Sequence, residues 1–158
     1  MKSDFMKWYE ELEQLTEEKT SANDTIDSKL VNDYEQYTAE SLVSYKMFWP
    51  SAWASSDKTR YTNSGITFSQ AIDEMLSIIS KLPSRKKFGI TISCDFLVKG
   101  TRFGAEAFYF YRFDEESSWP ATLRFNSRSI TKAPKWVRDA GQKILDALNV
   151  TNFKIENE

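Results

Sequence analysis

Histidine is absent from the 158 residues of this chain, and cysteine occurs only once, at Cys94. Without an imidazole there is no Ser-His-Asp or Cys-His relay and no histidine proton shuttle near neutral pH. One cysteine and no histidine cannot supply the nitrogen and sulfur ligands of a typical zinc site. The chain therefore lacks the means for most familiar enzyme chemistry, and we expect no catalytic residues, no metal and no cofactor.

Disulfides and long apolar runs are missing as well. A single cysteine cannot form an internal disulfide, which fits a reducing compartment, and Cys94 is expected to be a small core residue. No segment approaches ~18 consecutive apolar residues, and the charged stretch 1–18 lacks the apolar core of a signal peptide. We interpret the protein as cytoplasmic, with no membrane partner.

Aromatic residues, by contrast, are abundant. They make up 15% of the chain, within an apolar content of 41%, which is typical of a packed globular protein. No internal repeat or low-complexity linker divides the sequence. We expect one domain over residues 1–158, with an acidic helical region, 1–40, packed on an α+β body, 41–158.

The net charge of −2 conceals an uneven distribution. Residues 1–40 carry 4 basic and 11 acidic side chains, whereas residues 82–143 carry 12 basic and 6 acidic ones. The simpler interpretation is two solvated faces of one globule. The alternative is that the acidic and basic parts each face a different partner.

Hydrophobic periodicity predicts an antiparallel sheet with helices mainly on one face, an α+β fold. Thr67 and Gln70 form a Thr-x-x-Gln capping box at the start of the clearest helix, and Pro83 ends it. Residues 51–65 are interpreted as a polar loop. The predicted helices cover 4–18, about 26–39, 67–82 and 134–148, and the predicted strands cover 42–49, 88–98, 103–113, 121–125 and 151–155.

The central hairpin, 88–98 with 103–113, gives the most specific local prediction. A two-residue turn at Gly100 and Thr101 suits a type II′ hairpin and fixes the register. Every pair on one face is then apolar or aromatic, which supports that register. These pairs are Val98 with Phe103, Phe96 with Ala105, Cys94 with Ala107, Ile92 with Tyr109, Ile90 with Tyr111, and Phe88 with Phe113.

On the other face the same register places Asp95 directly across from Glu106. Two facing carboxylates destabilise a ladder unless a shared proton, a cation or a basic side chain neutralises them. The simpler alternatives are a pair splayed into water or one bridged by Arg or Lys. Phe108 and Phe110 lie opposite small residues on this face, where they either seat a helix or contact a partner's side chain or a base.

Catalytic patterns are incomplete. Asp95 and Glu106 resemble the carboxylates of metal-dependent nucleases with an Asp…Glu-x-Lys pattern. Phe108 occupies the lysine position, so the set of residues that this chemistry needs is incomplete. Ser-x-x-Lys pairs begin at Ser55 and Ser84 without the companion motifs of that chemistry.

We therefore expect a non-enzymatic protein-binding module, specifically an intracellular inhibitor such as an immunity protein or antitoxin that covers a basic toxin domain. The predicted helix 4–18 carries an acidic face whose charges the helix dipole and i,i+4 repulsion disfavour, so helix stability does not explain them. Acidic surfaces speed association with a cationic partner. The expected partner-binding residues are Glu10, Glu13, Glu17, Glu18, Asp95, Glu106, Phe108 and Phe110.

The alternative is a single-stranded nucleic-acid-binding protein. Phe108 and Phe110 would form a stacking platform on a basic, aromatic sheet face, beside Arg102, Arg112, Arg124 and Arg128. Acidic neighbours such as Glu106 count against this alternative, because they would repel phosphate.

Overall fold

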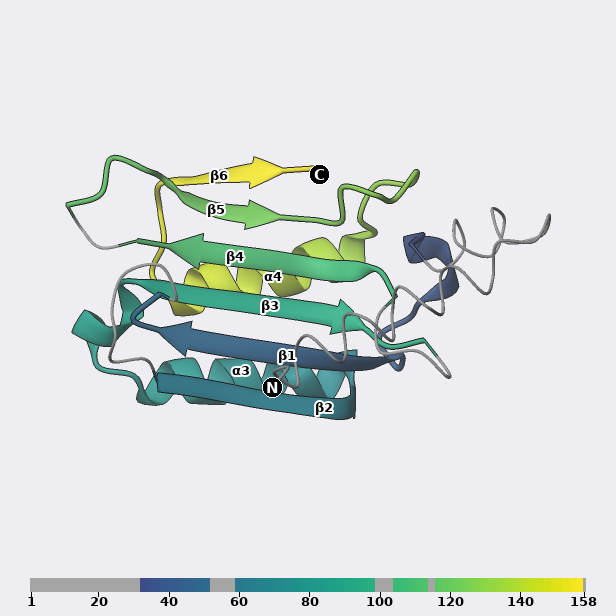
Figure 1. Ribbon diagram of the computed structural model, residues 1–158, viewed down its shortest axis with the longest axis horizontal. Helices are drawn as coiled ribbons and strands as arrows, with labels where there is room; N and C mark the ends of the chain where they lie inside the picture. Colours follow the sequence, from purple (N-terminus) through teal and green to yellow (C-terminus); the bar gives the residue numbers. More distant parts are fainter. Residues whose placement is uncertain (1–31, 52–58, 99–103, 114–115, 158) are drawn as a thin grey trace, which may run out of the picture. The chain divides into compact units, whose positions relative to one another are not determined.

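The protein, seen in Figure 1 as a computed structural model, is built on one open six-stranded sheet. The structure describes residues 32–51, 59–98, 104–113 and 116–157. The predicted helix over 4–18, with Glu10, Glu13, Glu17 and Glu18, lies outside these residues.

The strands follow the order β2-β1-β3-β4-β5-β6, and all neighbours pair antiparallel except β5 and β6, which are parallel. The α-helices α3 and α4 both lie behind the sheet in Figure 1, so the predicted α+β fold with helices on one face is confirmed. The elements are η1 (Tyr34–Gln36), β1 (Leu42–Trp49), β2 (Thr59–Thr67), α3 (Phe68–Lys81), η2 (Ser84–Lys87), β3 (Ile90–Phe96), β4 (Glu106–Arg112), β5 (Ala121–Arg124), α4 (Lys135–Ala147) and β6 (Phe153–Glu156).

The core fills the space between the sheet and the two helices. The predicted capping box is present: Thr67 accepts from the Gln70 backbone N–H, and the Gln70 side chain accepts from the Thr67 N–H. Helix α4 approaches the sheet closely at Gly141, where a Cβ atom would lie 2.9 Å from Leu123. Cys94 is fully buried, as expected for a core residue. Neither helix in the described part of the chain has the length and apolar character needed to cross a bilayer.

Two sequence predictions about elements are wrong. The polar loop predicted over 51–65 contains most of β2, whose largely exposed residues show no apolar alternation because neither side of the strand lies deep in the core. Of the helix predicted over about 26–39, residues 26–31 lie outside the described residues, and the rest contains a single 3-10 turn, η1, capped by Asp33. Tyr37 is already extended there, and its ring stacks on Phe96 with centroids 4.2 Å apart.

The predicted hairpin register is correct at one position and wrong beyond it. Asp95 is paired with Glu106, as predicted, but Cys94 is paired with Phe108 instead of Ala107. A β-bulge at this point adds one residue to β4, which reverses the alternation of every later side chain. Consecutive residues Ala107 and Phe108 are therefore both fully buried.

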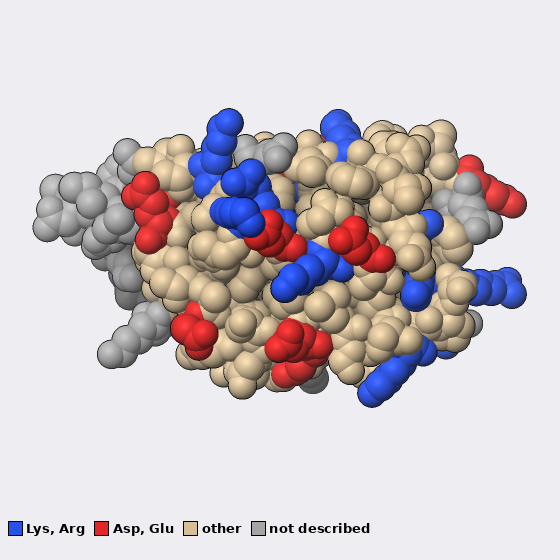
Figure 2. Space-filling view, turned by 180° about the vertical axis from the view of Figure 1, so that it is seen from behind, with Lys and Arg blue, Asp and Glu red and all other residues tan. Residues whose placement is uncertain are grey.

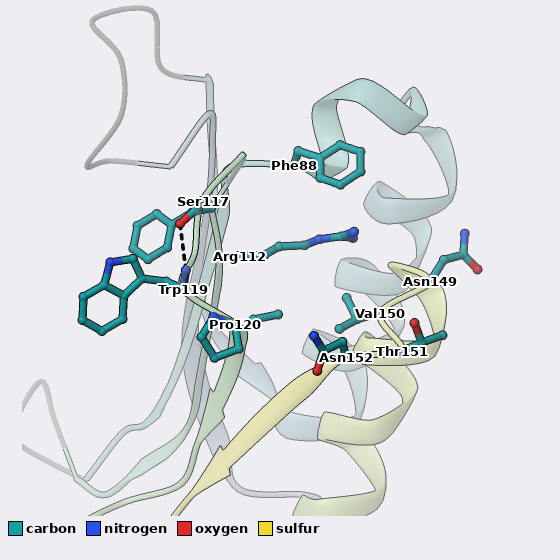
Figure 3. A pocket seen from close by; sticks show the side chains of 11 residues that line it. Phe88, Arg112, Ser117, Trp119, Pro120, Asn149, Val150, Thr151 and Asn152 are labelled. Carbon is teal, nitrogen blue, oxygen red and sulfur yellow. Dashed lines mark hydrogen bonds between the residues drawn. The ribbon is translucent and has the colours of Figure 1, made fainter. Parts of the chain in front are cut away.

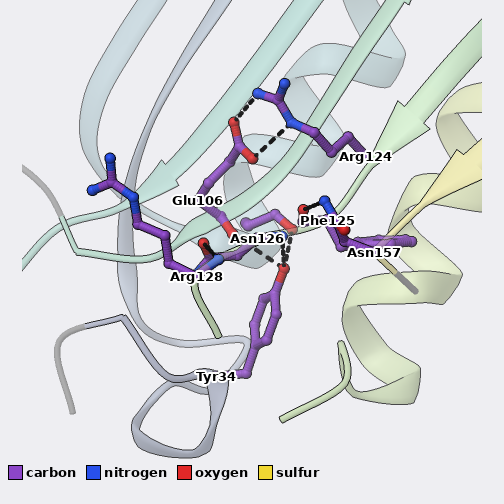
Figure 4. Close-up of polar contacts among 8 residues, drawn as sticks. Tyr34, Glu106, Arg124, Phe125, Asn126, Arg128 and Asn157 are labelled. Carbon is purple, nitrogen blue, oxygen red and sulfur yellow. Dashed lines mark hydrogen bonds and ion pairs between the residues drawn. The ribbon is translucent and has the colours of Figure 1, made fainter. Parts of the chain in front are cut away.

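Tyr34 holds this bulge in place from far away in the sequence (Figure 4). Its hydroxyl lies 3.1 Å from the carbonyl oxygen of Glu106 and 3.0 Å from that of Ala107, the acceptors available to its proton. The same oxygen accepts a 2.7 Å hydrogen bond from the backbone N–H of Asn126. Burial raises the pKa of Tyr34 above its ordinary value, so the hydroxyl keeps its proton. Tyr34 thus contacts backbone groups of the bulge and of Asn126, which follows β5 closely in the chain.

Tyr37 fixes the start of the same strand. Its hydroxyl oxygen accepts from the Ala105 N–H at 3.3 Å. A Cβ atom on Gly104 would lie 2.1 Å from that oxygen, so only glycine fits beside it.

Tyr34→Phe tests the anchoring of the bulge. The variant keeps the buried ring but leaves the Asn126 N–H without its acceptor, so we expect the free energy of unfolding to fall by about 1–3 kcal/mol. Tyr61→Phe is the matched control, because Tyr61 is 48% exposed, and it should change stability by less than ~0.5 kcal/mol. Urea unfolding of the three proteins provides the measurement, and equal stability of Tyr34→Phe and the parent would contradict the anchoring role.

Candidate functional site

The face of the sheet opposite α3 and α4, here called the outer face, is the principal candidate site. The cross-strand pairings align its side chains in two rows that run across the strands. The first row is Thr62, Lys46, Ser93, Tyr109, Arg124 and Glu156, and the second is Arg60, Phe48, Thr91, Tyr111, Thr122 and Lys154.

Three aromatic rings follow one another along β4 on the outer face. The ring centroids of Tyr109 and Tyr111 are 5.9 Å apart, and those of Tyr111 and Phe113 are 5.5 Å apart. All three side chains are partly exposed. Their cross-strand neighbours in β3 are the small residues Ser93 and Thr91, of which Thr91 is buried. We call Tyr109, Tyr111 and Phe113 the aromatic stripe.

Arg124 connects the aromatic stripe to the acidic pair. Its guanidinium lies 4.7 Å from the centroid of the Tyr109 ring, a cation–π contact. It also donates to both carboxylate oxygens of Glu106, from Nη2 at 2.8 Å and from Nε at 3.3 Å (Figure 4). These hydrogen bonds raise the pKa of Arg124. Of the alternatives for the facing carboxylates, the structure therefore has a basic side chain that neutralises one of them, Glu106.

Asp95 is the other half of that pair. Burial raises its pKa to about 7, and the negative charge of Glu106 adds to the increase, while Lys46 and Arg124 oppose it. The side chain therefore changes charge near neutral pH, at the margin of the aromatic stripe. In the described ranges, no three Cys, Asp or Glu side chains come close enough together to hold a metal ion.

Phe108 and Phe110 do not belong to this surface. Both are fully buried on the helix side, where Phe108 meets the Phe68 ring edge to face at 6.4 Å between centroids. They seat a helix, which was one of the two alternatives, and the stacking platform predicted from them is wrong because the bulge reverses their direction. Sequence reasoning missed Tyr109 and Tyr111. A usable signal was present, since β4 alternates Phe with Tyr and a Tyr hydroxyl is costly to bury without a partner.

A pocket of about 320 Å³ lies at one end of the sheet near Trp119, which is 69% exposed (Figure 3). Arg112 points into it, with its guanidinium 4.2 Å from the centroid of the Phe88 ring. Nη1 of Arg112 donates to the Leu148 carbonyl at 3.1 Å, just after the C-terminal end of α4. These contacts give Arg112 a structural role as a helix cap, so the outer face remains the stronger candidate site.

The helix side of the molecule carries Lys and Arg as well as Asp and Glu side chains across its surface (Figure 2). Because positive and negative side chains are mixed on this side, we do not assign a separate site to it. No family model matches this chain, and the comparisons found no similar protein among curated sequences or solved structures. The case for function consequently depends on the chemistry of the outer face.

Asp95→Asn tests the electrostatics of the outer face. The folded-state pKa of about 7 lies above the ordinary value of 3.8, so folding favours the protonated acid. The stability that this group contributes is complete below pH 3.8 and is lost as the pH rises through about 7. We expect Asp95→Asn to match the parent in acid and to exceed it by on the order of 1–2 kcal/mol at about pH 8.

Urea unfolding across that pH range measures the difference, with Asp139→Asn as the control. Asp139 is an exposed residue paired with Lys135 at 2.7 Å on α4, and its replacement should leave the pH dependence unchanged. A marked loss of stability in Asp95→Asn at alkaline pH would contradict the expected repulsion.

Proposed function

We propose that this protein is a non-enzymatic module that binds another protein through the outer face of its sheet. The observation that carries the proposal is the aromatic stripe with Arg124 lying against it. Tyr and Arg are enriched among the residues that dominate binding energy at protein interfaces. They offer large contact areas together with hydrogen-bonding groups.

The arrangement of the stripe supports this use. The rings are held on a strand in the middle of a sheet, so little conformational entropy is lost when they are covered. Arg124 is already oriented by its two hydrogen bonds to Glu106. Lys46 and Lys154, both exposed, and Glu156 supply a polar margin around the rings.

Within this class we propose an intracellular inhibitor, such as an immunity protein or antitoxin that covers a basic toxin domain. The absence of histidine and the single, buried cysteine are compatible with a cytoplasmic protein that works by binding. The basic character of the partner is inferred from residues 1–40, with their 11 acidic and 4 basic side chains.

Single-stranded nucleic-acid binding is the second candidate function. Tyr109 and Tyr111 lie on the sheet face opposite α3 and α4, and they favour this function because bases stack on such rings. Asp95 and Glu106 count against it, since phosphate contacts supply most of the affinity for nucleic acid.

Tyr111→Ala tests the binding face. Captured partners of the parent protein are identified by mass spectrometry, and the affinity of the purified partner is then measured by calorimetry. We expect the variant to bind at least ~10-fold more weakly, because a central Tyr at an interface contributes about 2 kcal/mol. Tyr111→Phe should keep most of the affinity, and Ile130→Ala, at a residue 67% exposed outside the sheet, should keep all of it. Unchanged affinity of a folded Tyr111→Ala protein would remove the stripe from the binding site.

Fluorescence anisotropy with a labelled single-stranded oligonucleotide separates the two candidate functions. The protein-binding proposal predicts no saturable signal at physiological salt. Salt-sensitive binding that Tyr111→Ala weakens would favour the nucleic-acid alternative.

A quadruple change of Glu10, Glu13, Glu17 and Glu18 to Gln tests steering by the acidic N-terminal sequence. Gln preserves helix propensity, so stability should hold or rise. If these charges attract a basic partner, stopped-flow kinetics will show an association rate about 10-fold lower with a weaker salt dependence.

The control replaces three exposed acids of α3 and α4, Asp73, Asp139 and Asp146, by Asn. It removes a similar amount of charge elsewhere and should affect association much less. Equal association rates for the quadruple variant and the parent would exclude steering by the acidic sequence.

A further inference from the structure

The two edges of the sheet differ in a way that points to self-association. Strand β2 forms one edge and β6 the other (Figure 1). Strand β6 is four residues long and carries an ion pair, with Lys154 Nζ 3.4 Å from Glu156 Oε1. Strand β2 has nine residues, largely exposed, with Arg60 as its only charge and no proline. Long edge strands without charged or proline guards are templates for pairing with another strand.

Backbone direction in β1 identifies which residues of β2 face outward. The Leu97 N–H donates to the Leu42 carbonyl at 2.8 Å, so the backbone groups of Leu42 point away from β2. Along a strand, the backbone N–H and C=O groups of successive residues point alternately to one side and to the other. The odd-numbered residues of β1, including Tyr45 and Met47, therefore direct their backbone groups toward β2.

Their partners in β2 are Asn63 and Tyr61, which use their own N–H and C=O groups within the β1–β2 ladder. The intervening residues Arg60, Thr62 and Ser64 consequently direct theirs away from β1. The Ser64 N–H agrees with this assignment, because it donates outside the β1–β2 ladder, to the side-chain oxygen of Asn63 at 2.8 Å. Pairing with a second strand would replace this side-chain contact by a backbone one. In the described residues, no strand pairs with this side of β2.

We infer that two copies of this chain associate by antiparallel pairing of their β2 strands. The two-fold axis passes between Thr62 of one copy and Thr62 of the other. The three outward-facing residues are spaced symmetrically around Thr62. Only this register pairs all three of them with outward-facing residues of the second copy: Thr62 with Thr62, and Arg60 with Ser64 in both directions. A two-fold interface of this kind is self-complementary and closes at two subunits.

The side chains suit that register. Arg60 meets a serine hydroxyl instead of another arginine, so no like charges oppose each other. Tyr61, 48% exposed, lies across from Asn63 of the second copy and loses part of its exposed area. A two-fold axis perpendicular to the sheet also places both outer faces on the same side of one continuous sheet.

Sedimentation equilibrium over a concentration series tests the inference on the full chain. The parent protein should shift from monomer to dimer as concentration rises. Thr62→Pro should weaken dimerisation at least ~10-fold, because it removes a central donor that the β1–β2 ladder does not use, a position where an edge strand tolerates proline. Thr62→Val keeps the donor and should dimerise like the parent. A parent that stays monomeric throughout, or a Thr62→Pro protein that dimerises equally well, would overturn the inference.

Charge variants at Ser64 test the register and do not depend on the proline variant folding. Ser64→Glu places a carboxylate across from Arg60 of the other copy twice per dimer and should tighten the dimer about 3- to 10-fold. Ser64→Arg places like charges there and should weaken it by a similar factor. Equal effects of both changes would contradict the register. Because this readout is self-association, it stands apart from the proposed binding of another protein.

Discussion

The direction of every ring on β4 depends on one extra residue opposite Cys94 and Asp95. An undisturbed ladder would turn Tyr109 and Tyr111 into the core and leave Phe108 and Phe110 outside. The bulge buries both Phe side chains, each contributing about 1.5–3 kcal/mol, and it avoids enclosing two tyrosine hydroxyls that would need partners. The backbone groups that the bulge disturbs lie within reach of the Tyr34 hydroxyl. A residue that precedes β1 in the chain thereby contacts the bulge that orients these rings, more than 70 positions later.

Charged side chains lie around the aromatic stripe on the outer face of the sheet. Glu106 faces another carboxylate, Asp95, but Arg124 donates two hydrogen bonds to the Glu106 carboxylate, and its guanidinium lies over the Tyr109 ring. Burial and the charge of Glu106 raise the pKa of Asp95 to about 7, and Lys46 and Arg124 offset only part of that increase. The sheet thus offers rigid rings, a fixed guanidinium and one carboxyl that responds to pH. These groups suit recognition of a partner, which is the function proposed above.

Local patterns in the sequence were sufficient for much of the fold. Periodicity and the Thr67 capping box located α3, and the alternation in 88–98 located β3, because those signals come from neighbours in the chain. Strand β2 was missed because its exposed residues carry no apolar pattern, and the edge it forms exists only once β1 is placed. The pairing of Asp95 with Glu106 was found, whereas the fate of Phe108 was not. The bulge depends on Tyr34 and Tyr37, whose contacts with β4 are made across long sequence separations that no local pattern records.

Nuclear Overhauser effects between the Cα protons of β3 and β4 test the central claim most directly. Residues 91 and 93 direct their backbone groups toward β1, so their Cα protons lie close to those of their partners in β4. The structure predicts cross peaks between Ser93 and Tyr109 and between Thr91 and Tyr111. Cross peaks between Ser93 and Phe108 and between Thr91 and Phe110 would show an unbulged ladder. That result would turn the tyrosines inward and contradict the binding face proposed for this protein.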